Sequence, residues 1–176
     1  MEIRLLNEED DIDAVCGIYA ASWKSAYKGI IPQEFLDNIY KERWRERIQN
    51  SELISLVMLN EEKIIGTVSY CASRSICLKG FGEIVSLYLL PDYCGNGYGR
   101  QLLQAAVDGL AEMGYLYVFL WVLEENMRTR AFYEKFGFQN SRDCLKDNMG
   151  GKDLRELRYI YEIKSGVRIQ WDFQRK

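Results

Sequence analysis

A loop with three alternating glycines, at residues 94–100, lies between two segments of opposite character. The segment before it, residues 81–90, is almost continuously apolar, which is typical of a strand buried on both faces of a sheet. The segment after it, residues 97–113, repeats apolar side chains at helical spacing, and another apolar run follows at 116–123. This order predicts two parallel strands joined by a crossover helix.

The glycine loop predicts a binding site for a phosphate group. Glycine lets the backbone curl and approach a ligand with no Cβ in the way. The N–H groups of the loop and of the first helical turn then point at one spot, near the positive end of the helix dipole. Arg100 stands where a dinucleotide-binding fingerprint needs its third glycine, and the chain has no Gly-Lys-Ser/Thr motif here. A plain tight turn between strand and helix is the alternative.

The rest of the chain predicts a mixed sheet with helices on both faces. Apolar side chains alternate in some segments and recur at helical spacing in others. We expect strands over residues 2–6, 53–59, 63–73, 81–90, 116–123, 138–147 and 153–163, and helices from an Asn7 N-cap to about residue 27, over 33–49, over 97–113 and from an Asn126 N-cap to 136. The fold class is therefore α+β, with a mostly antiparallel sheet of six to seven strands.

Composition limits the chemistry further. The 176 residues are 48% hydrophobic and 28% charged with a net charge of −3, so we expect one globular domain that binds neither nucleic acid nor a membrane. Five scattered cysteines and the lack of a basic-then-apolar leader indicate a cytoplasmic protein with reduced thiols. The chain contains no histidine, which excludes Ser-His and Cys-His catalysis and nearly every zinc site, so we expect no metal.

Two motifs resemble those of the GNAT superfamily, the acyl-CoA-dependent N-acetyltransferases. Residues 87–103, LYLLPDYCGNGYGRQLL, resemble motif A around its Gln/Arg-x-x-Gly-x-Gly/Ala signature. The segments NMR at 126–128 and FYEKFGF at 132–138 resemble motif B. The motifs stand in the family's order, and the resemblance covers most of residues 2–163. One departure is Cys94, which occupies the usual Gln/Arg position.

The resemblance implies an enzyme that moves an acetyl group from acetyl-CoA to a primary amine of a small molecule, a peptide or a protein. It implies the acyl-CoA N-acyltransferase fold for residues 1–164. In the family a backbone N–H, here that of Leu89, polarises the thioester carbonyl beside a bulge of its strand. The alternative for Asn126 is a plain helix cap. The cofactor-binding residues carried over are Leu87, Leu89, Gly95, Asn96, Gly97, Tyr98, Gly99, Arg100 and Asn126.

Two residues are the candidates for proton transfer. The resemblance places Tyr133 as the acid that protonates the leaving thiolate, because a tyrosine is protonated at pH 7. The alternative is an aromatic core residue beside Phe132. Glu83 is the only acid in an otherwise apolar strand, so burial would raise its pKa toward that of a useful general base for the amine. The alternative places Glu83 in solvent at the strand entrance.

The acceptor amine is expected to bind against residues 22–44, where the loop at 27–32 and the aromatic side chains Trp23, Tyr40 and Trp44 lie. The alternative for these aromatic residues, which stand at helical spacing, is packing in the core. The other function class open to this sequence is a noncatalytic acyl-CoA-binding or regulatory domain, which needs the glycine loop but not a catalytic acid. Residues 165–176 form a C-terminal extension whose apolar side chains alternate. We expect the extension to pack as an added strand on its own sheet or on a second copy in a homodimer.

Overall fold

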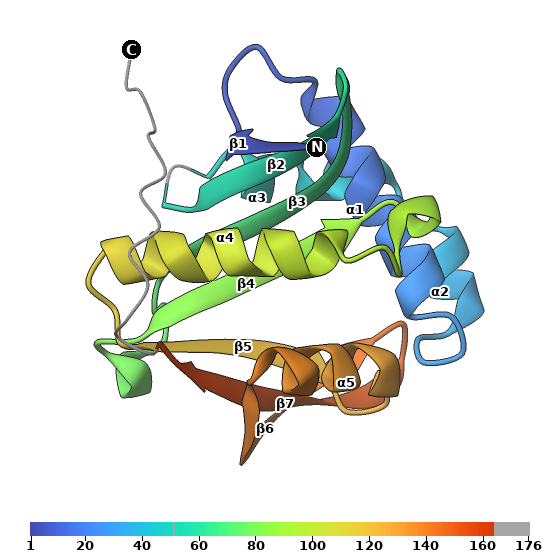
Figure 1. Cartoon of the computed structure of the whole chain (residues 1–176). Helices are drawn as coiled ribbons and strands as arrows, with labels where there is room; N and C mark the ends of the chain where they lie inside the picture. The colour runs from blue at the N-terminus through green and yellow to red at the C-terminus, as the bar shows by residue number, and fades with distance from the viewer. Residues whose placement is uncertain (51, 164–176) are drawn as a thin grey trace.

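The structure, a computed structural model, describes residues 1–50 and 52–163, and the predicted extension at 165–176 lies outside these residues. Its helices and strands are shown in Figure 1. In chain order they are β1 (Glu2–Leu5), α1 (Ile12–Ala26), α2 (Gln33–Asp37), the 3-10 turn η1 (Lys41–Trp44), α3 (Arg45–Ile48), β2 (Ile54–Asn60), β3 (Lys63–Ala72), η2 (Ile76–Leu78), β4 (Gly82–Leu89), η3 (Pro91–Tyr93), α4 (Tyr98–Glu112), β5 (Tyr117–Leu123), α5 (Met127–Phe136), β6 (Gln139–Met149) and β7 (Lys152–Glu162).

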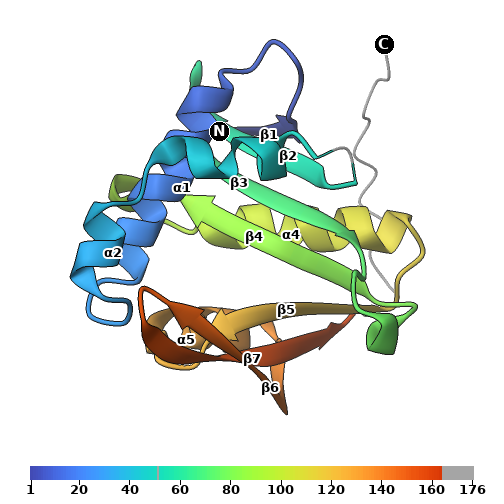
Figure 2. The same cartoon turned by 180° about the vertical axis from the view of Figure 1, so that it is seen from behind.

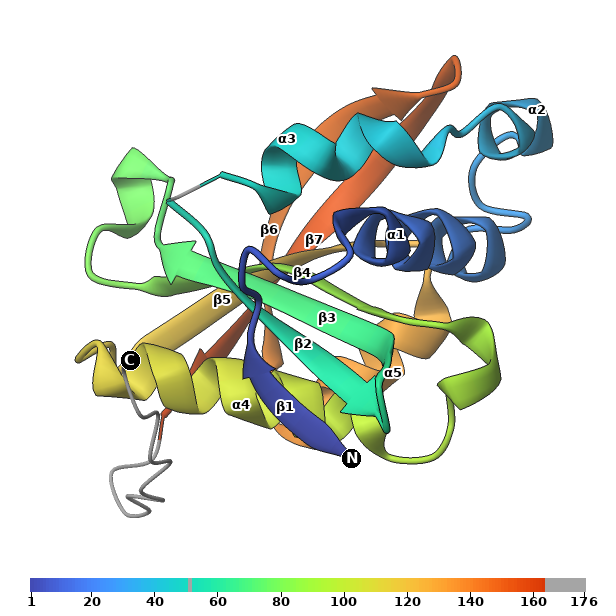
Figure 3. The same cartoon turned by 90° about the horizontal axis from the view of Figure 1, so that it is seen from above.

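The strands form one seven-stranded sheet in the order β1-β2-β3-β4-β5-β7-β6. Every neighbouring pair is antiparallel except β4 and β5, which run parallel and are joined by α4. Helices α1, α2 and α3 lie over one face of the sheet, and α4 and α5 lie over the other (Figures 2 and 3). The predicted α+β class and crossover are therefore confirmed. No helix within the described ranges is long and apolar enough to cross a membrane.

Each face of the sheet carries its own hydrophobic core. Strand β2 shows the alternation, because Leu56 and Met58 pack on the α4 side whereas Val57 and Leu59 pack on the α1 side. Burial on both faces explains why no charged residue occurs within β2, or in β3 after Lys63. Burying one such side chain contributes about 1.5–3 kcal/mol, so the two cores supply most of the stability of the sheet.

Most elements begin and end within two residues of the predicted limits, and α1 is one exception. Its N-cap is Asp11 and not Asn7, because the Asp11 carboxylate accepts hydrogen bonds from N–H groups of the first turn. Asn7 instead closes a turn, in which its side chain accepts from the Glu9 N–H at 2.9 Å. Asp10 is ion-paired with Arg4 of β1 at 2.6 Å. The acidic run therefore belongs to the β1–α1 loop rather than to the helix.

The prediction of one long helix over residues 33–49 is wrong, because this segment forms three short elements, α2, η1 and α3. Asn38 ends α2, and its side-chain amide donates to the Glu34 carbonyl, which competes with continuation of the helix. Tyr40 is then extended and 65% exposed, contrary to its predicted place on the apolar side. The side chains from this region that do pack in the α1-side core are Leu36, Ile39, Trp44 and Ile48.

Two helix glycines offer a matched test of this packing. A Cβ on Gly109 of α4 would lie 2.7 Å from Cζ of Tyr70 on β3, whereas a Cβ on Gly17 of α1 would meet nothing within 4 Å. We expect Gly109→Ala to lower the free energy of unfolding by about 1–3 kcal/mol through overpacking. We expect Gly17→Ala to raise it by about 0.5–1 kcal/mol, because alanine is the better helix former. Urea denaturation measures both, and equal stability of the two variants would contradict the packing of α4 on β3.

Candidate active site

A pocket of about 520 Å³ opens where β4 and β5 separate. Within the part of the chain that the structure describes, the two strands pair only at Gly82↔Val118 and Glu83↔Phe119. They then diverge toward the N-terminal ends of α4 and α5 (Figure 1). Residues of β4 and β5 form two walls of the pocket, and α1, the glycine loop, α5 and β7 supply the others.

The backbone of β4 offers hydrogen-bond donors to this opening. The Leu90 N–H donates to the Ile65 carbonyl of β3 at 2.9 Å. Because hydrogen-bond direction alternates along an antiparallel strand, the N–H groups of Leu87 and Leu89 point away from β3 and toward the opening. Both residues line the pocket. The bulge of β4 lies at Val85, where the register with β3 shifts, and not at Leu89 where we expected it.

Side chains of α1 hold β4 in this open arrangement. The Ser22 hydroxyl donates to the Leu89 carbonyl at 2.6 Å, a group that β5 would satisfy if the two strands stayed paired. The hydroxyls of Tyr19 and Ser86 lie 2.8 Å apart and form a second buried contact between α1 and β4. A buried carbonyl with no partner costs about 1–3 kcal/mol. Ser22 therefore compensates for the separation of the strands.

The glycine loop lies at one end of the pocket, between η3 and α4. Gly95 and Gly97 have φ angles of 90° and 85°, in the left-handed region that favours glycine. Gly97 is the N-cap of α4, and no side chain caps the first turn of this helix. The N–H groups of that turn can therefore face a ligand, as an anion-binding helix N-terminus requires.

The structure divides the predicted loop residues into two groups. Asn96 and Tyr98 do not line the pocket, and the Tyr98 side chain instead packs against the core near Tyr93. Cys94, the departure from the family pattern, is exposed and lines the pocket. The predicted loop residues that line it are Gly95, Gly97, Gly99 and Arg100.

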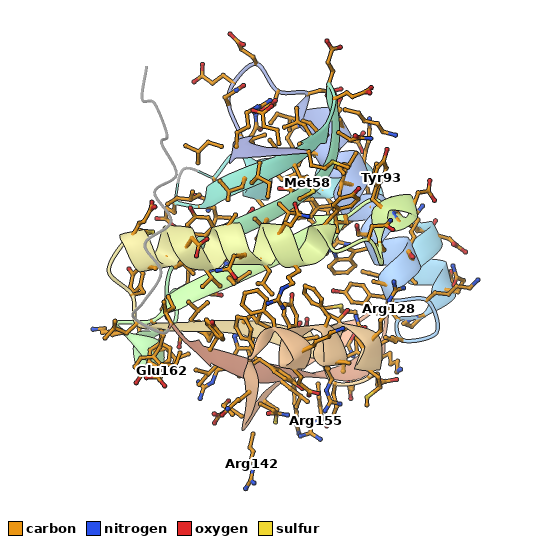
Figure 4. All side chains as sticks on the ribbon, in the orientation of Figure 1. Met58, Tyr93, Arg128, Arg142, Arg155 and Glu162 are labelled. Carbon is orange, nitrogen blue, oxygen red and sulfur yellow. The ribbon has the colours of Figure 1, made fainter. Side chains whose placement is uncertain are left out.

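Three basic side chains line the pocket: Arg100 of α4, and Arg128 and Lys135 of α5. Figure 4 labels Arg128, which lies beside the start of α5. The described residues offer none of the three an ion-pair partner, and Arg100 lies over the Phe136 ring at 5.1 Å. Their positive charge suits the binding of phosphate groups.

Tyr133 of α5 lines the pocket and also belongs to the core on that face of the sheet. Its ring packs against Phe138 with centroids 5.7 Å apart. Its hydroxyl forms no hydrogen bond with any described residue, so the core uses the ring and leaves the hydroxyl without a partner. Burial raises the pKa of Tyr133 above its ordinary value, and the hydroxyl therefore keeps its proton at pH 7.

Asn126 caps α5, and its position leaves the second predicted role, a contact with the cofactor, open. Its Oδ1 accepts a hydrogen bond from the Thr129 N–H at 3.1 Å and so caps α5. The residue is buried and lines the pocket. Because the cap uses only the oxygen, the side-chain NH₂ can donate to a ligand.

Glu83 lies at the paired end of β4 and does not line the pocket. Glu83 is buried, but both oxygens of its carboxylate accept hydrogen bonds from Arg74. The Arg74 backbone N–H and Nε each donate to Oε2 at 3.1 Å, and Nη2 donates to Oε1 at 2.6 Å. The structure does not bring Glu83 together with Tyr133. Glu83 therefore serves an internal ion pair, and we do not assign it the general-base role.

Sequence reasoning missed Glu156 of β7, which is partly buried and lines the pocket. Burial raises its pKa above the ordinary value, and the Asp147 carboxylate adds to this shift. The sequence carries little signal for Glu156, because charged side chains are frequent throughout its strand. Among the described residues, no group of three or more Cys, Asp or Glu side chains is arranged to hold a metal ion.

The predicted acceptor region, residues 22–44, contributes to the pocket through the end of α1 and not through the expected aromatic residues. Trp23 and Trp44 are buried in the α1-side core, and Tyr40 is exposed. Burial raises the pKa of Tyr27, which does line the pocket. The lining residues from this region are Ser22, Ser25, Ala26 and Tyr27.

These features define an acyltransferase that uses an acyl-CoA: backbone donors in a strand opening, a glycine loop at a helix N-terminus and a protonated tyrosine. The chain belongs to the GNAT family of acetyltransferases, because the model of the Acetyltransferase (GNAT) family matches residues 15–138. An uncharacterized N-acetyltransferase of Bacillus subtilis, YuaI, is 28% identical over 152 residues, which cover 84% of this chain and 86% of the relative. The spermidine N(1)-acetyltransferase of Thermoplasma acidophilum is 27% identical over 168 residues, which cover 90% and 98%.

Solved structures share the fold. The PaiA N-acetyltransferase from Thermoplasma acidophilum, solved in complex with coenzyme A, superposes with a TM-score of 0.71 at 21% identity and covers 93% of this chain and 100% of that chain. The ribosomal-protein-S18-alanine N-acetyltransferase from Escherichia coli superposes with a TM-score of 0.69 at 16% identity and covers 97% and 98%. The acyltransferase fold predicted from the two motifs is therefore confirmed.

The ion-pair and general-base assignments of Glu83 predict opposite results for Glu83→Gln. The amide keeps the shape of the side chain but loses the charge that Arg74 binds. Because the Arg74 side chain is 51% exposed, we expect only a modest loss, about 1–2 kcal/mol in the free energy of unfolding. We expect kcat for amine acetylation to change by less than about twofold. Urea denaturation and steady-state thiol release measure the two quantities. A normal stability with kcat lowered about a hundredfold would return Glu83 to the catalytic machinery.

Proposed function

We propose that this protein transfers the acetyl group of acetyl-CoA to a primary amine of a small molecule, a peptide or a protein. The observation that carries the proposal is a pocket that joins the glycine loop, the β4–β5 opening and Tyr133. The same pocket also reaches the end of α1, on the opposite face of the sheet. Acetyl-CoA can thus enter from one face of the sheet and the acceptor amine from the other, so that the amine meets the thioester in the opening between the strands.

Each part of acetyl-CoA has a complementary part of the pocket. The pyrophosphate suits the N–H groups of the glycine loop and of the first turn of α4. Arg100, Arg128 and Lys135 supply positive charge for the phosphates. The pantetheine arm suits the opening between β4 and β5, where its amides would replace the missing strand partners.

The N–H groups of Leu87 and Leu89 would stabilise the reacting thioester. Attack by the amine places negative charge on the carbonyl oxygen, and fixed backbone donors stabilise this charge more in the transition state than in the ground state. The Ser22 hydroxyl fixes the Leu89 carbonyl and so restrains the backbone that carries these donors. Tyr133 then donates its proton to the sulfur when the C–S bond breaks.

A primary amine as the acceptor is supported by one relative, the spermidine N(1)-acetyltransferase of Thermoplasma acidophilum, because spermidine is a polyamine. The rival function, a noncatalytic acyl-CoA-binding domain, needs no protonated hydroxyl in its pocket, and Tyr133 therefore favours an enzyme. All five cysteines are free thiols, which supports a reducing compartment such as the cytoplasm.

Tyr133→Phe tests the proposed proton transfer. The variant removes only the hydroxyl, so the ring should keep its packing and the Kd of acetyl-CoA should change by less than about twofold. Without the acid, kcat for thiol release with spermidine should fall roughly ten- to a thousandfold. Tyr161→Phe is the matched control, because Tyr161 packs on the same core but does not line the pocket.

An unchanged kcat in Tyr133→Phe, measured where chemistry limits the rate, would assign Tyr133 to the core alone. The wild-type protein is tested on spermidine, lysine and a peptide with a free N-terminus. Tight acetyl-CoA binding with no amine-dependent thiol release on this panel would favour the noncatalytic domain.

A further inference from the structure

Five acidic side chains in residues 1–50 and 52–163 are partly or fully buried, and Glu156 differs from the other four. The other four have partners: Arg4 for Asp10, Arg74 for Glu83, Gln104 for Asp108 and Arg155 for Glu124. The Glu156 carboxylate has no hydrogen-bond or ion-pair partner among the described residues. The side chain is partly buried, and its carboxylate is still accessible at the pocket wall, so a cationic ligand in the pocket would supply the partner that the described residues do not.

The basic residues on the same strand are already engaged with other acids. Their partners are Glu125 for Lys152, Glu124 for Arg155 and Asp143 for Arg158. Lys152 is held further by the Ile30 carbonyl, to which its Nζ donates at 2.7 Å. Rearrangement of these side chains toward Glu156 would break existing ion pairs, so β7 itself has no free positive charge to offer Glu156, and the three unpaired basic side chains of the pocket are proposed above to bind the phosphates.

Glu156 lies on the side of the pocket from which an acceptor can approach. It is opposite Leu123 of β5 and on the same face as Leu154, which packs in the α1-side core. Tyr27, at the end of α1, lines the pocket with it, and Glu156 and Tyr133 both lie near enough to the Tyr27 hydroxyl to raise its pKa. Tyr133 itself belongs to the opposite face. A group bound at Glu156 therefore lies across the opening from the proposed acid.

We propose that Glu156 binds the ammonium group of the acceptor and takes its proton before the amine attacks the thioester. The inference rests on the acetyltransferase function proposed above and names the acceptor as a cationic primary amine. It gives Glu156 the general-base role that the sequence suggested for Glu83.

The proton and electron pairs balance in the following order. The R–NH₃⁺ group gives one proton to the Glu156 carboxylate, and the freed lone pair forms a C–N bond with the thioester carbon. The C–S bond breaks, and the sulfur takes the Tyr133 proton. The nitrogen then loses its second proton to the Tyr133 oxygen, and Glu156 releases its proton to water. The sum is acetyl-CoA plus R–NH₃⁺ giving R–NH–acetyl, CoA thiol and one H⁺.

Burial helps Glu156 in this role. An alkylammonium ion has a pKa of ~10.4 and an ordinary glutamate one of ~4.3, so a raised glutamate pKa narrows an unfavourable gap. Tyr27 at the end of α1 and Asp147 of β6 are the titratable groups that interact with Glu156, and Tyr133 of α5 lies across the opening. The neighbouring strands β5 and β6 present the apolar Leu123 and Leu145 opposite Glu156. Burial raises the pKa of both tyrosines, so both stay neutral between pH 6 and about 9.5.

Glu156→Gln tests the proposal, with Glu162→Gln as the matched control. Glu162 is on the same strand and the same face but is exposed and outside the pocket, and in Figure 4 it lies at the opposite end of the sheet from Arg128. At pH 7 we expect Glu156→Gln to lower kcat/KM for spermidine by roughly a hundredfold or more, with the acetyl-CoA Kd within about twofold of wild type. The defect should shrink toward about pH 9.5, where more of the amine is already deprotonated.

Glu156→Asp keeps the charge on a shorter side chain and should retain more activity than Glu156→Gln. An unchanged kcat/KM in Glu156→Gln would overturn the assignment. A defect of equal size at every pH, accompanied by a lower Tm and weaker acetyl-CoA binding, would make Glu156 a structural residue and also overturn it. A wild-type protein that binds acetyl-CoA but acetylates neither spermidine nor a free peptide N-terminus would refute the proposed function itself.

Discussion

The separation of β4 from β5 is the constraint on which the rest of the site depends. Two neighbouring parallel strands share only two paired positions in the described chain and then leave their facing backbone groups without strand partners. Such an opening is stable only if other groups form hydrogen bonds with the backbone groups that have no strand partner. Ser22 satisfies the Leu89 carbonyl from α1, and the bulge at Val85 bends β4. The result is a pocket that reaches both faces of the sheet and presents backbone donors inside it.

The sequence predicted the parts of the fold that depend on local patterns. The strand, glycine loop and helix around Gly97, and the short helix capped by Asn126, follow directly from periodicity and turn chemistry. The segments that failed depend on side-chain competition: Asp11 replaces Asn7 as a cap, and Asn38 interrupts a helix whose apolar spacing was correct. Both outcomes depend on which polar side chain wins a local hydrogen bond, which periodicity does not record.

The carboxylates of Glu83 and Glu156 show the same contrast between what a local sequence pattern indicates and what the tertiary structure decides. A lone acid in an apolar strand indicated a functional group at Glu83, but burial there is compensated by Arg74, whose pairing across a β-hairpin the sequence did not reveal. Glu156 sits in a strand with many charges and becomes distinctive only when three strands and a helix meet around it. The presence or absence of a protein partner separates the two acids, and a partner is a property of the tertiary structure.

The central claim is that the β4–β5 opening holds the thioester of acetyl-CoA. A crystal structure of the protein with acetyl-CoA or a hydrolysis-resistant thioether analogue tests it most directly and needs no knowledge of the acceptor. The account predicts the pantetheine arm between β4 and β5, with its reactive carbonyl oxygen about 2.7–3.2 Å from the Leu87 or Leu89 nitrogen. A cosubstrate bound at the glycine loop whose arm runs outside this opening, with β4 and β5 unoccupied, would contradict it.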